Sequence, residues 1–226
     1  MVRVWEIDTE TYPQNFVISV YNKKQFGEIN TSFELINNML DLFPKSFYTD
    51  PTLRWLDPCC GCGYFTIVLF HRLFIGLENI IQDPEKRKKH IISNMIFMIE
   101  INKENYNTLK ELFGEDSNII NFDFLSTTKK QLADLWGIFG NLEKKNGFDA
   151  IIGNPPYNSM GSIKVPTNKT DKKTGDGKTV WRDFVKMAIS LLCDKHEIPG
   201  YLSFIIPSIW MKPDKERMYH FLTQYK

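Results

Sequence analysis

The sequence has few cysteines, and their arrangement excludes two ways of stabilising a small protein. Only four of the 226 residues are cysteines, and three of them, Cys59, Cys60 and Cys62, fall within four positions. Cysteines this close cannot build a disulfide framework, and their spacing is not that of a zinc site. We therefore interpret them as small buried residues in a reducing compartment, and we expect no bound metal.

The sequence also lacks a long apolar run and an excess of charge of either sign. Because it has no signal peptide and no apolar span of about 18 residues, we expect an intracellular, cytoplasmic protein without membrane contact. Lys and Arg number 28 against 27 for Asp and Glu, which gives a net charge of +1. A dedicated nucleic-acid binder is usually more basic, but DNA is not excluded because only a local patch has to meet phosphates.

What the sequence does contain is an alternation of short apolar runs with helical patterns. Its hydrophobic content of 42% and its 226 residues suffice for one large folded domain. The predicted strands cover residues 52–57, 96–100, 119–124, 148–153 and 200–207, and predicted helices cover 66–74, 102–113, 180–193 and 213–225. This alternation is typical of an α/β fold with a doubly wound, mostly parallel sheet. Residues 1–26 are expected to form an N-terminal arm or short strand, and the charged residues 83–90 a solvated loop.

A glycine-containing turn follows the first predicted strand. Asp57 ends that strand, and Gly61 and Gly63 let the backbone turn tightly and approach a ligand closely. A dinucleotide-binding turn has a third glycine, at the position that Thr66 occupies here. The turn therefore favours a nucleoside cofactor without phosphates, and Asp57 is placed to accept a hydrogen bond from a ligand ammonium group.

The next two strands each end in an acid. Glu100 ends the second, where folds of this class place the acceptor for ribose hydroxyls. Asp123 ends the third and is a candidate acceptor for an adenine amine, with Phe124 or Leu125 covering the ring. An equal alternative is that Asp123 caps the helix after Ser126.

A further helix is predicted to begin at Thr31 or Ser32, either of which is a good N-cap, and to stop at Pro44. Taken alone, the segment is interpreted first as an ordinary amphipathic helix. The second interpretation is a helix whose free N–H groups hold a carboxylate.

The tetrapeptide Asn154-Pro155-Pro156-Tyr157 follows the fourth predicted strand. The two prolines lack N–H groups and continue neither sheet nor helix, so the backbone carbonyls remain available to a ligand. Asn154 adds a side-chain acceptor and Tyr157 an aromatic face. Two acceptors and a stacking surface suit a planar base that carries an exocyclic amine.

Residues 158–178 are rich in glycine and lysine and are expected to form a mobile basic loop beside this edge of the sheet. The loop is predicted either to follow a phosphate backbone or to be merely solvated. Its candidate nucleic-acid contacts are Lys164, Lys169, Lys172, Lys173 and Lys178.

These motifs, in this order, resemble those of the S-adenosylmethionine-dependent amino-methyltransferases that make N6-methyladenine in DNA. The likeness is to the gamma arrangement, in which the cofactor motifs precede the catalytic one, and it covers about residues 27–212. It implies a Rossmann-like methyltransferase fold, S-adenosylmethionine as cofactor and DNA as partner. The residues it implies for cofactor binding are Thr31, Asp57, Pro58, Cys59, Gly61, Gly63, Glu100, Ile101, Asp123 and Phe124, and those for catalysis are Asn154, Pro155, Pro156 and Tyr157.

The sequence departs from the family in two respects. Ser32 stands where the family often has Pro, and Cys59 and Cys62 where it usually has Ser or Ala. The family's sheet also normally closes with two further strands before a target-recognition region. We therefore expect residues 27–226 to form a methyltransferase catalytic domain that lacks the final strands and a target-recognition domain. A recognition subunit or a missing C-terminal region would complete it.

The implied reaction is methyl transfer to the N6 amine of adenine in DNA, and two alternatives remain open. An N-methyltransferase acting on RNA adenine or on protein glutamine would use the same tetrapeptide, although the glutamine enzymes typically have an N-terminal helical domain that 26 residues cannot supply. A cofactor-binding subunit that needs a partner for activity is the other alternative. The intact Asn154 and Tyr157 argue against a retired site.

Overall fold

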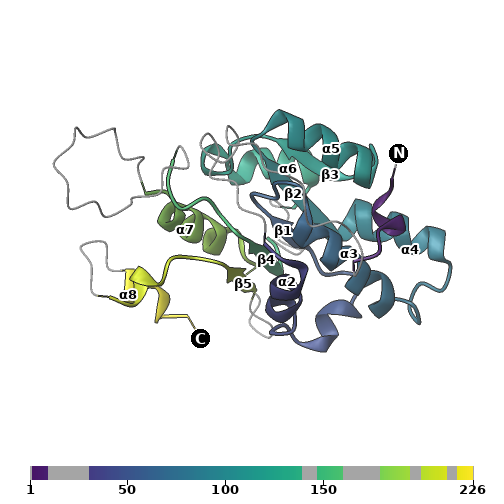
Figure 1. The fold of residues 1–226 in the computed structure, drawn as a ribbon, viewed down its shortest axis with the longest axis horizontal. Coiled ribbons are helices and arrows are strands. Elements are labelled where there is room, and N and C mark those ends of the chain that lie inside the picture. The colour runs from purple at the N-terminus through teal and green to yellow at the C-terminus, as the bar shows by residue number, and fades with distance from the viewer. Residues whose placement is uncertain are drawn as a thin grey trace.

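Five short apolar segments form one parallel sheet at the centre of the fold. The computed structural model describes residues 2–9, 31–138, 147–159, 179–193, 200–212 and 218–225. The strands within these ranges are β1 (Trp55–Asp57), β2 (Ile96–Glu100), β3 (Asn118–Asn121), β4 (Ala150–Gly153) and β5 (Tyr201–Phe204). Their order is β3-β2-β1-β4-β5, and every neighbouring pair is parallel (Figure 1). The predicted α/β fold is confirmed.

Alternate residues of the central strands enter two apolar clusters, one on each face of the sheet. Trp55 of β1 and Met98 of β2 belong to one cluster, and their neighbours Leu56 and Phe97 belong to the other. Successive side chains of a strand point to opposite faces, and all four of these are at most 4% exposed. Both faces of the sheet are therefore covered, as expected for parallel strands.

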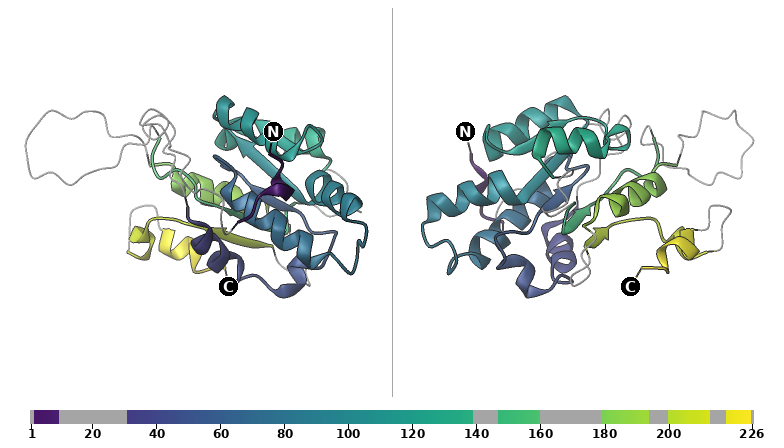
Figure 2. Two further views of the ribbon diagram at one scale, coloured as in Figure 1. Left: turned by 45° about the vertical axis from the view of Figure 1, so that its right-hand side comes forward. Right: turned by 180° about the vertical axis from the view of Figure 1, so that it is seen from behind.

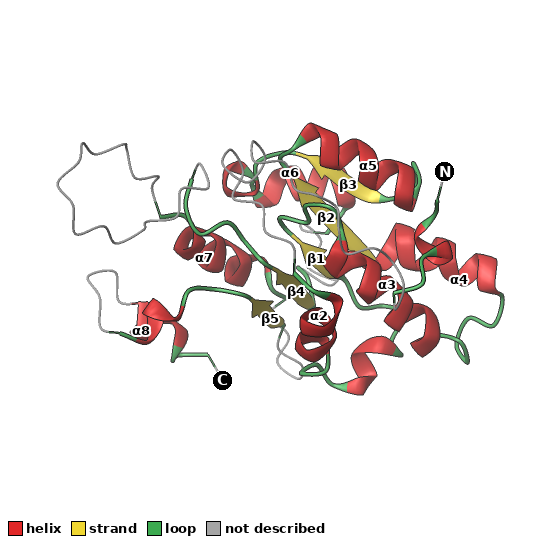
Figure 3. Ribbon diagram, in the orientation of Figure 1, coloured by secondary structure: helices red, strands yellow, loops and turns green. Residues whose placement is uncertain are grey.

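Helices provide the cover on both faces (Figures 2 and 3). The first cluster contains residues of α2 (Phe33–Leu40), α3 (Tyr64–Gly76) and α5 (Lys103–Phe113), and the second contains residues of α6 (Lys129–Trp136) and α7 (Trp181–Leu191). Further helical elements are α4 (Pro84–His90), α8 (Met218–Leu222) and the short turns Val4–Glu6, Lys45–Tyr48, Ile91–Met95, Phe124–Ser126 and Ser208–Met211. In the described ranges, no helix combines the length and apolarity that crossing a membrane requires.

The expectation of a solvated loop at residues 83–90 is wrong, because most of this run forms helix α4. Asp83 is its N-cap: the Oδ1 atom accepts from the backbone N–H of Glu85 at 2.9 Å and of Lys86 at 3.1 Å. Pro84 stands in the first turn, where its missing N–H costs nothing. Arg87 is buried, with its guanidinium 4.1 Å from the centre of the Phe74 ring. A cation thus provides the packed side of a helix that has no apolar stripe.

Of the expected N-terminal arm or short strand, only residues 2–9 lie within the described ranges. Residues Val4–Glu6 form one turn of 3-10 helix, and Val4 and Ile7 are buried in the first cluster. The alternating residues 16–21 lie outside the described ranges. The helix expected to run to Pro44 ends at Leu40 instead, and Pro44 caps the next short turn. Ser32, rather than Thr31, caps α2, since its Oγ accepts from Leu35 N at 3.3 Å.

The order of the strands determines where a ligand can bind. β1 has β2 on one side and β4 on the other, so the chain reverses its direction of winding beside β1. Ligands of open α/β sheets bind at such a switch point, outside the carboxyl ends of the strands. Asp57, Glu100 and Gly153 are the last residues of β1, β2 and β4, respectively. The residues that follow these strands therefore meet at one edge.

Replacing Gly76 with alanine is expected to destabilise the protein. A Cβ at this position would collide with the backbone carbonyl of Tyr48, which has no flexible end that can move away. We expect Gly76→Ala to lower the free energy of unfolding by about 1–3 kcal/mol or more, as overpacking does. Urea denaturation measures it, with Gly137→Ala as the matched control, because no atom lies within 4 Å of a Cβ there. Gly137 has φ +63°, so its variant should lose only about 1 kcal/mol. Equal losses would show that contact with Tyr48 is unimportant.

Candidate functional site

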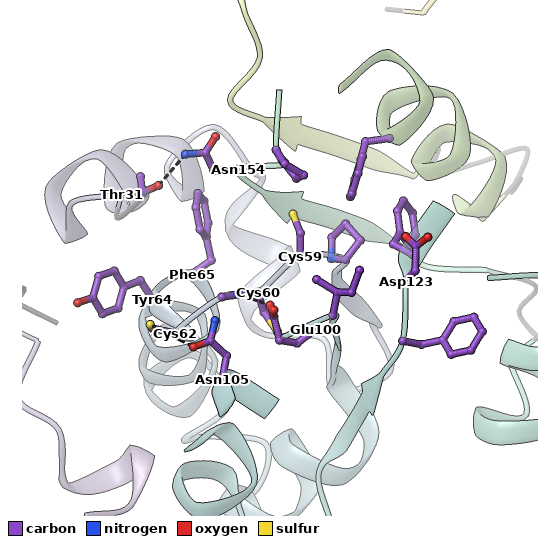
Figure 4. A pocket seen from close by; sticks show the side chains of 17 residues that line it. Thr31, Cys59, Cys60, Cys62, Tyr64, Phe65, Glu100, Asn105, Asp123 and Asn154 are labelled. Carbon is purple, nitrogen blue, oxygen red and sulfur yellow. Dashed lines mark hydrogen bonds between the residues drawn. The ribbon is translucent and has the colours of Figure 1, made fainter. Parts of the chain in front are cut away.

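A pocket lies at the carboxyl edge of the sheet and collects most of the residues predicted for the site. Figure 4 shows Thr31 and Asn154 at one side of it and Asp123 at the other. The predicted residues that line it are Thr31, Pro58, Cys59, Gly61, Glu100, Ile101, Asp123, Phe124, Asn154 and Pro156. The predicted residues outside its lining are Asp57, Gly63, Pro155 and Tyr157, and the five lysines of the basic loop lie outside the described ranges. The structure thus brings the two predicted motifs, for cofactor and for catalysis, to one place.

Glu100 holds the backbone around the pocket in place. Its Oε2 accepts from Gly61 N at 2.6 Å and its Oε1 accepts from Asn102 N at 2.8 Å. One carboxylate therefore ties the glycine turn after β1 to the start of α5. A carboxylate has about four acceptor sites, which is more than the two that these backbone N–H groups use. The residue is 5% exposed, and its remaining accessible face lines the pocket.

The glycine turn fits closely against α5. Gly63 has φ +85° and precedes α3, and a Cβ there would lie 2.6 Å from Leu109 Cδ2. The position requires glycine both for its left-handed backbone and for the space. Asn105, one turn into α5, lines the pocket beside Cys62, whose Sγ lies 3.9 Å from Asn105 Oδ1. Asn105 was not predicted as a site residue, although its place in the first turn of α5 puts it at the same edge of the sheet as Asn102, the N-cap of that helix.

Asp57 lies behind the pocket lining. It is 2% exposed, and its Oδ1 accepts from Cys59 N at 3.3 Å while its Oδ2 has no hydrogen-bond partner in the described structure. Burial raises the pKa of the Asp57 carboxyl to about 8, and the nearby charge of Glu100 adds to the shift. Burial likewise raises the pKa of the Cys59 thiol well above its usual value. Both groups are therefore expected to hold a proton near neutral pH.

The tetrapeptide begins directly against this buried acid. Gly153, the residue before Asn154, has φ +150°, and a Cβ on it would lie 3.0 Å from Asp57 Oδ1 and 3.6 Å from Cys59 Sγ. Asn154 turns its amide toward the start of α2, where Nδ2 donates to Thr31 Oγ1 at 3.2 Å (Figure 4). The side-chain oxygen of Asn154 takes no part in this contact. Thr31 is therefore next to the catalytic candidate as well as in the predicted cofactor site.

Tyr157 is fixed by α7 rather than by the pocket. Its carbonyl accepts from Val180 N at 3.0 Å, just before α7 begins. Its ring packs against a third apolar cluster that includes Trp181, Val185 and Met218. Partial burial raises the pKa of the Tyr157 hydroxyl above its usual value. The tyrosine is thus a neutral, partly exposed ring beyond the prolines.

Asp123 lines the pocket and is also an N-cap, but of another element than the predicted one, and its predicted role as acceptor for an adenine amine stays a prediction. It lines the pocket and also caps the short turn Phe124–Ser126, accepting from Leu125 N at 3.0 Å. The helix after Ser126 is capped instead by Thr128, whose Oγ1 accepts from Gln131 N at 3.2 Å. The cap fixes the carboxylate at the rim of the pocket.

Two exposed apolar side chains stand at the pocket, although only one was predicted. Ile101 is 53% exposed and Phe122 is 41% exposed, and both line the cavity. Phe124 also lines it but is only 2% exposed, because it packs against Phe184 with ring centres 5.3 Å apart. Phe122 was missed because it was assigned to the strand, whereas β3 ends at Asn121. The exposed apolar surface is what a planar ring would cover.

Comparisons with known proteins agree with this picture. The sequence model of the family described as Eco57I restriction-modification methylase matches residues 20–226. The chain is 28% identical to an uncharacterized adenine-specific methylase of Mycoplasma pneumoniae, over 92% of this chain and 60% of that protein. It is 27% identical to the type II methyltransferase M.VspI of a Vibrio strain, over 88% of this chain and 40% of that protein. The chain therefore spans about 60% or less of the length of these relatives.

A solved structure shows the same fold. The modification subunit of a putative type I restriction enzyme from Vibrio vulnificus superposes with a TM-score of 0.56 at 16% sequence identity, covering 86% of this chain and 38% of that subunit. At this identity the likeness concerns the fold alone.

The buried carboxyl of Asp57 is expected to make stability depend on pH. Its folded pKa of about 8 lies above the unfolded value of 3.8, so between these values the folded chain keeps a proton that the unfolded chain releases. Raising the pH from 5 to 8 should therefore lower the free energy of unfolding, by at most about 1.4 kcal/mol per pH unit. Urea denaturation of wild type and Asp57→Asn at several pH values isolates this contribution, because the other groups are shared. Parallel curves for the two proteins would contradict it.

Proposed function

The chain belongs to the Eco57I restriction-modification methylase family, and from this premise we propose that it transfers the methyl group of S-adenosylmethionine to the N6 amine of adenine in DNA. The observation that carries the proposal is the position of Asn154. Its amide lies in the same pocket as Glu100 and Asp123, at the switch point of the sheet. An acceptor for an amine is thus placed beside acceptors for a nucleoside.

The residues of the pocket fit such a cofactor along its whole length. Glu100 has acceptor capacity for ribose hydroxyls, and Asp123 for the adenine amine. Ile101 and Phe122 offer the exposed apolar surface on which the adenine ring would lie. The amino-acid end of the cofactor would lie between two walls. One is the glycine turn with Pro58, Cys59 and Gly61, and the other contains Thr31. When bound, the cofactor supplies an electrophilic methyl group.

Asp57 supports the site from behind. Its Oδ2 is buried next to the turn, and it is the one carboxyl oxygen without a hydrogen-bond partner among the buried side chains of the described ranges. We assign this oxygen as the acceptor for the ammonium group of the cofactor, which it would reach once the glycine turn opens on binding. Its proton would then leave, since a cation beside a carboxyl favours the ionised form.

Asn154 activates the amine by accepting hydrogen bonds. The lone pair of an exocyclic amine is delocalised into the ring, which makes the nitrogen a weak nucleophile. The two N–H groups of the adenine amine donate to Asn154 Oδ1 and to the Pro155 carbonyl. These hydrogen bonds favour a tetrahedral nitrogen with a usable lone pair and aim that lone pair at the methyl group. Bound between Glu100, Asp123 and the glycine turn, the cofactor would supply the methyl group to this nitrogen and would keep the electron pair of the broken C–S bond on its sulfur. Asn154 is too weak a base to take the proton, so the amine releases it to water after transfer.

The base has to leave the duplex to reach this pocket. Enzymes that modify a base in DNA take it out of the stack, and the exposed part of Tyr157 is the surface on which it would stack. Lys164, Lys169, Lys172, Lys173 and Lys178 are proposed contacts for the DNA phosphates. The chain spans only part of its relatives, and we assign recognition of the target sequence to a recognition subunit or to a further region of a longer protein.

The reaction itself is the first test. Wild-type protein incubated with mixed-sequence duplex DNA and S-adenosylmethionine labelled at the methyl group should place label in N6-methyladenine, identified by nucleoside analysis. Asn154→Ala should reduce transfer by about 100-fold or more, because an acceptor aimed at the reacting group is lost, while binding of the cofactor persists. Asn107→Ala, an exposed position on α5, is the matched control and should transfer normally. Label in RNA or protein but not DNA, or full activity of Asn154→Ala, would contradict the proposal.

The role of Tyr157 is tested by separating its ring from its hydroxyl. Tyr157→Phe should retain most activity, because the ring remains. Tyr157→Ala should weaken binding of substrate DNA by about 1–3 kcal/mol, the value of one stacked base. Equilibrium binding of the intact duplex, compared with a duplex that has an abasic site in place of the target adenine, measures stacking of the flipped base separately from the packing against Trp181. An inactive Phe variant would assign the function to the hydroxyl.

A further inference from the structure

The hydrogen bond between Thr31 and Asn154 joins segments that lie 123 residues apart in the sequence. Thr31 is only 7% exposed, so its hydroxyl is held at the wall of the pocket. The side-chain cap of α2 comes from Ser32, whose Oγ accepts from Leu35 N at 3.3 Å. The Thr31 hydroxyl is therefore not needed to begin the helix, and the contact that it makes is with the amide of Asn154.

The orientation of that amide decides whether it can act. A primary amide has one acceptor oxygen and two donor N–H groups, and its two ends have nearly the same shape. If Asn154 turned by 180°, it would present a donor to an exocyclic amine, which is itself a donor. The contact of Nδ2 with Thr31 Oγ1 leaves Oδ1 as the end available to a substrate. Only this orientation supports the activation of an amine.

A hydroxyl alone does not enforce the orientation, because it can accept from Nδ2 or donate to Oδ1. The orientation of the amide is settled once a second group accepts a hydrogen bond from the Thr31 hydroxyl. A carboxylate only accepts hydrogen bonds. If one were bound to the Thr31 hydroxyl, Thr31 Oγ1 could only accept a hydrogen bond from Asn154. The cofactor of the proposed function carries such a carboxylate, and Thr31 lines the same pocket.

We propose that Thr31 is a positioning residue that couples binding of the cofactor carboxylate to the productive orientation of the Asn154 amide. The inference rests on the proposed function, which supplies the carboxylate. Thr31 acts through Asn154 and takes no part in bond making. A cofactor-free protein would then bind a flipped adenine less well than the loaded protein, because part of its population would have the amide reversed.

The contact is tested without turnover by recording the side-chain amide signals of Asn154 in ¹⁵N–¹H spectra, assigned by their absence from Asn154→Ala. Two ligands form a matched pair: S-adenosylhomocysteine has the amino-acid carboxylate, and its decarboxylated analogue keeps the ammonium group but lacks the carboxylate. In wild type and Thr31→Ser, the first ligand should shift the Asn154 signals clearly more than the second. In Thr31→Val, the signals should differ from wild type without ligand and respond alike to both. Identical signals in wild type and Thr31→Val, or equal responses of wild type to both ligands, would overturn the proposal.

Single-turnover methyl transfer at saturating cofactor provides the second readout. Thr31→Val should slow the step by about 10- to 100-fold, as misplacement of a catalytic group does, while Thr31→Ser stays within a few-fold of wild type. Thr108→Val is the matched control, because Thr108 is exposed on α5 and its hydroxyl bonds only within that helix in the described structure. An unchanged rate for Thr31→Val would overturn the coupling. Wild-type protein that transfers no methyl group to DNA would contradict the proposed function, whereas the spectra still decide whether Thr31 orients Asn154.

Discussion

The two hydrogen bonds accepted by the Glu100 carboxylate are the interaction on which the pocket depends. They join the turn that follows β1 to the first residues after β2, at Gly61 N and Asn102 N. Both lie away from bulk water, where a hydrogen bond is electrostatically stronger than in water. An acid at the end of β2 therefore does two things at once. It shapes the glycine turn as a wall, and it lines the space that the wall encloses.

A second constraint ties that wall to the tetrapeptide. β1 and β4 are neighbours in the sheet, so the residues that follow them are forced together. The Asp57 carboxyl group occupies the space that a side chain on Gly153 would need. The turn after β1 and the residue before the tetrapeptide are thus packed too closely to leave room for a side chain at position 153. The pocket is one packed unit rather than two motifs that face each other across solvent.

The parts of this structure that the sequence could predict are those whose signals are local. The acids at the strand ends, the Asn102 and Gly114 boundaries of α5 and the glycine turn each follow from a few adjacent residues. Helix α4 was mistaken for a loop because its packed side is the cation Arg87 over an aromatic ring, which hydrophobic periodicity cannot register. Two features of the pocket could not be anticipated, namely that Phe184 lines it and that Thr31 contacts Asn154. Both depend on packing between segments far apart in the chain.

That last contact also has a consequence in time. Thr31 is synthesised 123 residues before Asn154. At a synthesis rate of about 5–20 residues per second, roughly 6 to 25 s separate the two residues on the ribosome. During this interval the start of α2 has no Asn154 amide to contact. The residues of the glycine turn and Glu100 are both made before β4, so the pocket is complete only after β4 has joined the sheet beside β1.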